Sequence, residues 1–222
     1  MHTQSFRLKS KQNNPDGPIG IMAALEQEIA LILQNMGESV KVHLIAGRRY
    51  YQGELDGQKY IVVLSRVGKV AAASTVTTLI NQFNVQSVVF TGLAGGVHPD
   101  ALVGDIVIGR SVYQYDLDAS PLFPKFSVPL LNKTFFDSDE ELNEKISQSC
   151  SEYLENDFDL LFDPEQKKRF FQRTTPQLHT GLIGSGDLFI NAIEKQNQIA
   201  EDMPNTLCVE MEGAAVAQVC YE

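Results

Sequence analysis

A chain of 222 residues, of which 43% are apolar and 21% charged, is long enough to bury the core of one large α/β domain. Its formal net charge of −10 disfavours nucleic acid and anionic membrane surfaces as partners, and favours a neutral or cationic small ligand. No apolar run approaches the ~20 residues of a membrane span. The three cysteines, Cys150, Cys208 and Cys220, show no paired spacing, which predicts free thiols and a cytoplasmic location.

The N-terminal stretch is polar and lacks the apolar core of a signal peptide. We expect residues 1–18 to form a flexible N-terminal extension, followed by a single domain over 19–222. The domain begins with an apolar run over 19–24, which predicts a buried strand, and continues with apolar residues at helical spacing. Glu28 lies in the first turns of that predicted helix.

Strands and helices then alternate along the chain. Asp56 and Gly57 predict a β-hairpin over 49–64, because this pair supplies the positive φ angles of a type I′ turn. Further strands are predicted over 87–91, 105–113 and 178–183, and further helices over 70–80 and 139–154. This pattern predicts an α/β fold with a mixed, mostly parallel central sheet flanked by helices.

Two carboxylates follow the last predicted strand. Residues 207–209 are apolar, a small-residue helix pattern begins at Gly213, and Glu210 and Glu212 lie between them. Ligands of open α/β sheets bind outside the carboxyl ends of strands, so this junction is a candidate site. Glu212 could instead serve only the helix dipole, whereas Glu210, at the end of a buried run, needs a polar partner.

A proline-rich loop, the histidines and a glycine-rich turn add further expectations about the site. The proline-rich stretch over 120–132 is typical of an ordered loop that covers a pocket or a partner subunit. The four histidines are scattered, so no metal site is predicted, and the turn over 92–96 matches neither a Walker loop nor a dinucleotide fingerprint. If the sheet is parallel there, Glu28, this turn, Phe189 and the carboxylates of 210–212 converge on one rim. Such a rim suits a nucleoside, but these residues alone do not name a reaction.

Five motifs resemble, in order and spacing, those of the nucleoside phosphorylase superfamily. They are Ile19-Gly-Ile-Met-Ala-Ala-Leu-Glu-Gln-Glu28, Ser65-Arg-Val-Gly-Lys-Val-Ala-Ala-Ala73, Thr91-Gly-Leu-Ala-Gly-Gly96 with Val103-Gly-Asp-Ile-Val107, Ser185-Gly-Asp-Leu-Phe-Ile190 and Val209-Glu-Met-Glu-Gly-Ala-Ala-Val-Ala217. The match is best to the hydrolytic branch, the 5′-methylthioadenosine/S-adenosylhomocysteine nucleosidases. The resemblance implies cleavage of the N-glycosidic bond of an adenine thionucleoside by water, without cofactor or metal. It also implies nucleoside catabolism and methionine salvage.

The resemblance assigns roles to individual residues. It implies that Glu28 positions and deprotonates the attacking water, that Glu212 holds the 2′- and 3′-hydroxyls, and that Glu210 is a neighbouring acid. The implied substrate-binding residues are Val67, Leu93, Ala94, Gly95, Phe189, which stacks on adenine, Ile190, whose backbone reads the base edge, and Met211, which packs against the ribose. The loop over 117–129, with Phe123, resembles the segment that enters the partner subunit's pocket, which implies a homodimer.

Two departures from the family pattern stand out. Leu93 replaces a serine that is frequent in the family. In the family a further strand follows the position of Glu222 and carries a Ser-Asp pair, whose aspartate protonates N7 of the departing adenine; no residue here takes that role. We therefore expect a C-terminally incomplete domain, lacking its last strand and helix, with impaired activity, because general acid catalysis contributes about 10²–10⁴-fold.

Three alternatives remain at this point. One is a purine nucleoside phosphorylase of the same fold, for which Ser65 and Arg66 offer few phosphate donors and Glu28 would repel the anion. A second is a hydrolase of another purine nucleoside. A third is a catalytically impaired member that serves as a ligand-binding or dimerisation module.

Overall fold

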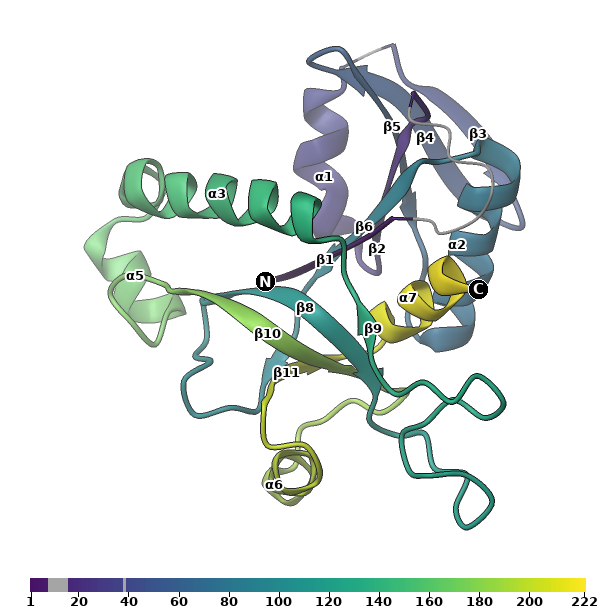
Figure 1. Cartoon of the computed structure of the whole chain (residues 1–222). Coiled ribbons are helices and arrows are strands. Elements are labelled where there is room, and N and C mark those ends of the chain that lie inside the picture. The colour runs from purple at the N-terminus through teal and green to yellow at the C-terminus, as the bar shows by residue number, and fades with distance from the viewer. Residues whose placement is uncertain (8–15, 38) are drawn as a thin grey trace.

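A computed structural model describes residues 1–7, 16–37 and 39–222 (Figure 1). Its strands are β1 (His2–Arg7), β2 (Ile19–Ala23), β3 (Lys41–Ile45), β4 (Arg48–Leu55), β5 (Gln58–Leu64), β6 (Ser87–Gly92), β7 (Gly95–Gly96), β8 (Ile106–Gln114), β9 (Phe136–Asp137), β10 (Leu178–Ser185) and β11 (Thr206–Glu210). Its helices are α1 (Glu26–Asn35), α2 (Lys69–Phe83), α3 (Glu140–Asn156), α4 (Phe158–Leu161), α5 (Pro164–Phe170), α6 (Ile193–Asp202) and α7 (Gly213–Tyr221).

The described strands join into one sheet in the order β3-β4-β5-β2-β6-β1-β8-β10-β11-β7, with β9 paired to β8. Two groups of parallel strands form its interior: β5, β2 and β6 on one side of β1, and β8, β10 and β11 on the other. Antiparallel pairs lie mainly toward the edges, where β3, β4 and β5 follow one another. The prediction of a mixed α/β sheet with parallel central strands is confirmed.

The predicted hairpin is β4 paired with β5. Its turn residues Asp56 and Gly57 have φ angles of 51° and 80°, the left-handed region that the Asp-Gly pair favours. The hairpin extends the parallel strands outward and carries Tyr50, which is fully buried and stacks on Phe83 of α2 at 5.1 Å between ring centroids.

The prediction of a flexible N-terminal extension is wrong for residues 2–7, which form β1 in the interior of the sheet. This strand pairs antiparallel with β6 and parallel with β8. On one face of β1, α3 supplies a partner for a buried polar side chain: the Ser5 hydroxyl donates to Oδ1 of Asn143 at 2.7 Å. On the other face Gly213, the first residue of α7, leaves room for Gln4. Residues 8–15, also part of the predicted extension, lie outside the described residues.

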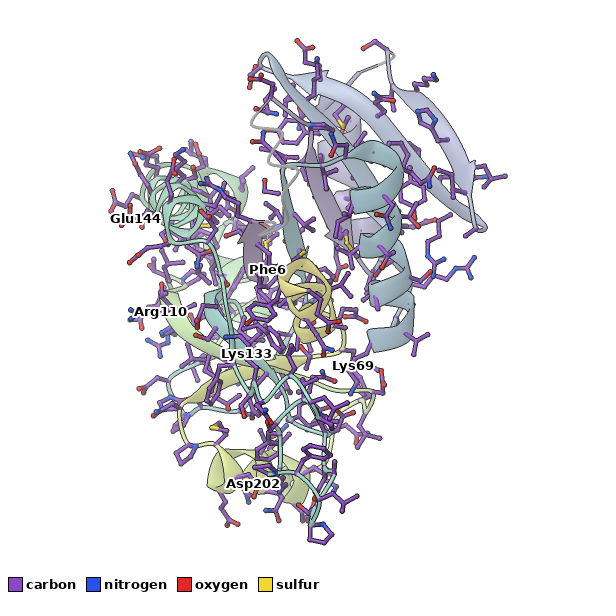
Figure 2. The ribbon with its side chains drawn as sticks, turned by 45° about the vertical axis from the view of Figure 1, so that its right-hand side comes forward. Phe6, Lys69, Arg110, Lys133, Glu144 and Asp202 are labelled. Atoms are coloured by element: carbon purple, nitrogen blue, oxygen red, sulfur yellow. The ribbon has the colours of Figure 1, made fainter. Side chains whose placement is uncertain are left out.

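Helices cover both faces of this sheet. α2 and α7 pack side by side against one face, and α3 lies across β1, β8 and β10 on the other (Figure 1). Phe6 lies beside α7 (Figure 2) and shares the main core with Val76, Phe90 and Val216, all at most 3% exposed. Burial of each such side chain contributes about 1.5–3 kcal/mol, so the α7 interface fixes the position of the β11–α7 junction. No described helix is both long enough and apolar enough to span a bilayer.

Candidate active site

The β11–α7 junction is held by Glu210, which is 6% exposed. Its Oε2 accepts the backbone N–H groups of Glu212 and Gly213, both at 2.8 Å, and the hydroxyl of Ser185 donates to Oε1. Ser185 in turn accepts the N–H of Ala214 at 2.7 Å. Burial raises the pKa of Glu210 to about 7, against the lowering effect of Ser185 and the two amides. This carboxyl therefore has the polar partners that its position demands: two amides of the strand-to-helix turn and the hydroxyl of Ser185 at the end of β10.

Glu212 reaches from this junction to the start of α2. Its Oε1 accepts the N–H of Gly68 at 2.7 Å. Gly68 has a φ of 100°, a conformation that glycine adopts without strain. Burial raises the pKa of Glu212; the Gly68 amide opposes that rise and the charge of Glu28 adds to it. The two carboxylates are thus close enough to repel each other.

Glu28 is fixed by three backbone amides. Its Oε2 accepts the N–H groups of Ala24 and Leu25 at 2.9 and 2.8 Å, which caps the first turn of α1, and its Oε1 accepts the N–H of Leu93 at 3.0 Å. A Cβ added at Gly92 would lie 3.0 Å from Oε1. The absence of a side chain at Gly92 lets the carboxylate lie directly against the end of β6.

One cavity of about 470 Å³ brings these groups together. Its volume is that of a typical small-molecule site. The carboxyl groups of Glu28, Glu210 and Glu212 line it. The other candidates that line it are Val67, Leu93, Ala94, Gly95, Phe189, Ile190 and Met211. Phe189 is 82% exposed and Leu93 68%, so the described cavity has an open, apolar mouth.

Phe123 is the candidate that the structure does not bring to this cavity. It is half-buried in the long connection between β8 and β9, which extends from the body as loops (Figure 1). Its assignment to a partner subunit's pocket stays a prediction.

A polar network beside the cavity was missed by the sequence analysis. Lys69, at the start of α2 (Figure 2), donates from Nζ to Oδ1 of Asp116 at 2.6 Å and from its backbone N–H to Oδ1 of Asp187 at 2.9 Å. The N–H of Asp187 donates to Oδ2 of Asp116 at 2.8 Å, and the Tyr115 hydroxyl donates to the carbonyl of Leu188 at 2.9 Å. This network anchors the loop that carries Phe189. Its members are too far apart in sequence for local spacing to link them.

His2 was also missed, because the sequence analysis placed it in a flexible extension. It lines the same cavity from the first position of β1 and is 1% exposed. His2 reaches the cavity because residues 2–7 pair with β6. No local sequence pattern predicts that pairing.

Comparison with known proteins places this architecture in a family. The profile described as "Phosphorylase superfamily" matches residues 18–222, and the chain belongs to that family. The chain is similar to the curated 5′-methylthioadenosine/S-adenosylhomocysteine nucleosidase of Staphylococcus aureus (strain MRSA252), with 31% identity over 92% of this chain and 80% of the relative.

Solved structures agree with this placement. The nucleosidase of the same name from Colwellia psychrerythraea 34H, in complex with adenine, is 32% identical and has a TM-score of 0.79 over 92% of this chain and 76% of its own. The futalosine hydrolase of Helicobacter pylori strain 26695 is 28% identical, with a TM-score of 0.75 over 93% of this chain and 79% of its own.

Proposed function

We propose that this protein is a purine nucleosidase that hydrolyses the N-glycosidic bond of 5′-methylthioadenosine and S-adenosylhomocysteine, releasing adenine and a thioribose. The similarity to nucleosidases of that name supports the substrate class. The observation that carries the proposal is the convergence of Glu28 and Glu212, 184 positions apart in the sequence, on one cavity of nucleoside size.

The chemistry of bond cleavage explains why two carboxylates suit this cavity. As the base departs, the sugar becomes oxocarbenium-like and carries positive charge, which fixed negative charge stabilises more in the transition state than in the substrate. The carboxylates of Glu28 and Glu212 are already held by backbone amides, so little reorganisation is needed during the reaction. Their mutual repulsion would be relieved by the cationic sugar.

Each carboxylate has a proposed role. Glu28 accepts a proton from the attacking water, whose oxygen adds to C1′. Glu212 accepts hydrogen bonds from the 2′- and 3′-hydroxyls, and Met211 packs against the ribose. Glu210 holds the β11–α7 junction that presents Glu212, because its Oε2 accepts two amides of that junction and its Oε1 accepts the hydroxyl of Ser185 at the end of β10.

The base is proposed to bind toward the 188–190 loop. Phe189 offers an aromatic face at the cavity mouth, and the backbone of Ile190 offers hydrogen-bonding groups to the edge of a purine. The other walls of the cavity are apolar or lack a side chain; they are formed by Val67, Leu93, Ala94 and Gly95.

Phosphorolysis fits this cavity less well than hydrolysis. Among the described residues that line it there is no lysine or arginine, whereas there are three carboxyl groups. A phosphate nucleophile requires cationic and hydroxyl donors and would be repelled here. A related substrate such as futalosine remains a second candidate because of the similarity to futalosine hydrolase.

We also propose a homodimer in which the loop over 117–129 contributes Phe123 to the 5′-pocket of the other subunit. Exposed apolar side chains in and beside this loop, Leu122 at 83% and Leu130 at 86%, support the presence of a partner surface. Three free cysteines support a reducing, cytoplasmic setting, in which the products would enter methionine salvage.

One assay tests the proposal. The protein is incubated with methylthioadenosine, adenosylhomocysteine, futalosine and inosine, with and without phosphate, and release of the free base is followed. Adenine release that does not depend on phosphate is expected. Phosphate-dependent release of hypoxanthine would point to a phosphorylase, release from futalosine alone to the second candidate, and no release from any substrate to a binding module.

A further inference from the structure

The ring of Phe189 lies where packing within the chain does little to hold it. Phe189 is 82% exposed at the cavity mouth, although the proposed function gives its ring the task of stacking on the base. A side chain that is so exposed makes few of the contacts that fix a buried one. The position of the ring therefore depends on the backbone before it, which is residues 186–188 of the loop after β10.

Tyr115 holds two of these three loop residues. Its hydroxyl donates to the carbonyl of Leu188 at 2.9 Å, and its ring lies so close to Gly186 that a Cβ there would collide with it. These contacts tie the loop to the chain that follows β8. The residue between the two, Asp187, connects the loop to α2.

Asp187 is bound through both its side chain and its backbone. Its Oδ1 accepts the N–H of Lys69, the first residue of α2, at 2.9 Å, and its own N–H donates to Oδ2 of Asp116 at 2.8 Å. Oδ1 of Asp116 accepts from Nζ of Lys69 at 2.6 Å, and these two side chains are only 17% and 19% exposed. Although Asp187 itself is exposed, each of the three residues is joined to the other two.

The start of α2 also holds Glu212. The N–H of Gly68 donates to Oε1 of Glu212 at 2.7 Å, and the N–H of the next residue, Lys69, is the one that binds Asp187. A Cβ added at Gly68 would lie 3.2 Å from Oδ1 of Asp187. The first N–H groups of a helix have no partner within it, and carboxylates suit its positive end. Since the two amides belong to consecutive residues, they hold the two carboxylates at a fixed separation.

We propose that Asp187 is a positioning residue that sets the place of Phe189 relative to Glu212, and so of the base relative to the ribose. This rests on the proposed nucleosidase function. Because the glycosidic bond joins base and ribose, a substrate stacked on Phe189 presents its hydroxyls to Glu212 only when the two groups are correctly spaced. Without the carboxylate of Asp187 the loop moves independently of α2, and fewer bound molecules have both parts in place.

A double-mutant cycle in kcat/KM for methylthioadenosine tests this role. Asp187→Ala should lower kcat/KM about tenfold, as loss of a hydrogen bond to a charged group does. Phe189→Ala removes the ring that Asp187 positions, so adding Asp187→Ala to it should lower kcat/KM by less than about twofold more. A residue that served only the stability of the fold would lower kcat/KM by the same factor in both backgrounds.

Two further variants separate geometry from general damage. Asp187→Asn keeps an oxygen that can accept the N–H of Lys69, and should retain kcat/KM within about threefold of the wild type. Asp163→Ala is the matched control, because Asp163 is also an exposed aspartate that accepts two amides at a helix start, those of Glu165 and Gln166 in α5, and it does not line the described cavity. It should leave kcat/KM unchanged.

The cycle has a second form in case Asp187→Ala does not fold. Asp187→Glu keeps the charge, but its longer side chain moves the loop away from α2, so the same loss is expected in the wild-type background and not with Phe189→Ala. Equal factors in the two backgrounds, a single variant within twofold of the wild type, or an equal loss in Asp163→Ala would overturn the proposal.

Activity separates this proposal from the function on which it rests. A wild-type protein that releases adenine from methylthioadenosine, together with additive effects of Asp187→Ala and Phe189→Ala, refutes the role of Asp187 alone. A wild-type protein that releases no adenine refutes both.

Discussion

Replacing Glu210 with glutamine tests whether its buried carboxyl sets a pH dependence of stability. Unfolded, this group titrates near its ordinary value of 4.5; folded, burial raises its pKa to about 7. Between these two values the folded protein binds a proton that the unfolded chain does not. The contribution of Glu210 to the free energy of unfolding therefore falls as the pH rises.

The magnitude follows from the difference between the two pKa values. Each unit corresponds to about 1.4 kcal/mol, so between about pH 5 and about pH 8 the contribution of this carboxyl should decrease by roughly 2 to 3 kcal/mol. The glutamine keeps a carbonyl oxygen for the amides of Glu212 and Gly213 and offers an N–H₂ to Ser185, but does not titrate.

Urea denaturation of the wild type and Glu210→Gln across this pH range gives the measurement. The free energy of unfolding of the wild type, minus that of the variant, should decline by that amount as the pH rises and then level off above about pH 8. Titrating groups that do not interact with Glu210 cancel in the difference, whereas Glu212, whose charge adds to the rise in the pKa of Glu210, is coupled to it. Parallel curves for the two proteins would refute the reasoning that burial dominates the titration of Glu210.

Further substitutions test the remaining parts of the site. Glu28→Gln should lower kcat for methylthioadenosine by about 10²–10⁴-fold through loss of the proposed base, and full activity would remove that role. Gly92→Ala should lower kcat on the order of 10- to 100-fold, because the added Cβ lies 3.0 Å from Oε1 of Glu28 and displaces that carboxylate. An unchanged kcat would contradict the argument. Asp116→Asn should raise KM roughly tenfold, because it loosens the loop that carries Phe189. The control is Asp159→Asn, which breaks an ion pair with Lys167 elsewhere and should leave KM unchanged. An unchanged KM in both variants would show that the network does not position the loop.

Sequence patterns predict the parts of this fold whose residues follow a local rule. The hairpin of β4 and β5 depends on Asp56 and Gly57, and β6 on a β-branched run that ends at Gly92. The position of Glu212 follows from a strand ending and a helix beginning within a few residues. These signals are local, and they suffice to place strand ends on a common rim.

The rest could not be predicted because long-range partners decide it. The sequence of β1 is polar, which does not predict a buried strand. Its burial depends on residues far away in sequence: Asn143 accepts a hydrogen bond from Ser5, and Gly213 leaves room for Gln4. Distant pairing also forms the network of Lys69, Asp116 and Asp187, and it brings His2 to the cavity.

A crystal structure with a non-hydrolysable adenine thionucleoside analogue tests the central claim most directly. It should place the ribose hydroxyls within hydrogen-bonding distance of Glu212 and a water between Glu28 and C1′, inside the cavity at the end of β6. An analogue bound elsewhere, or bound there with its sugar turned away from both carboxylates, would contradict the claim.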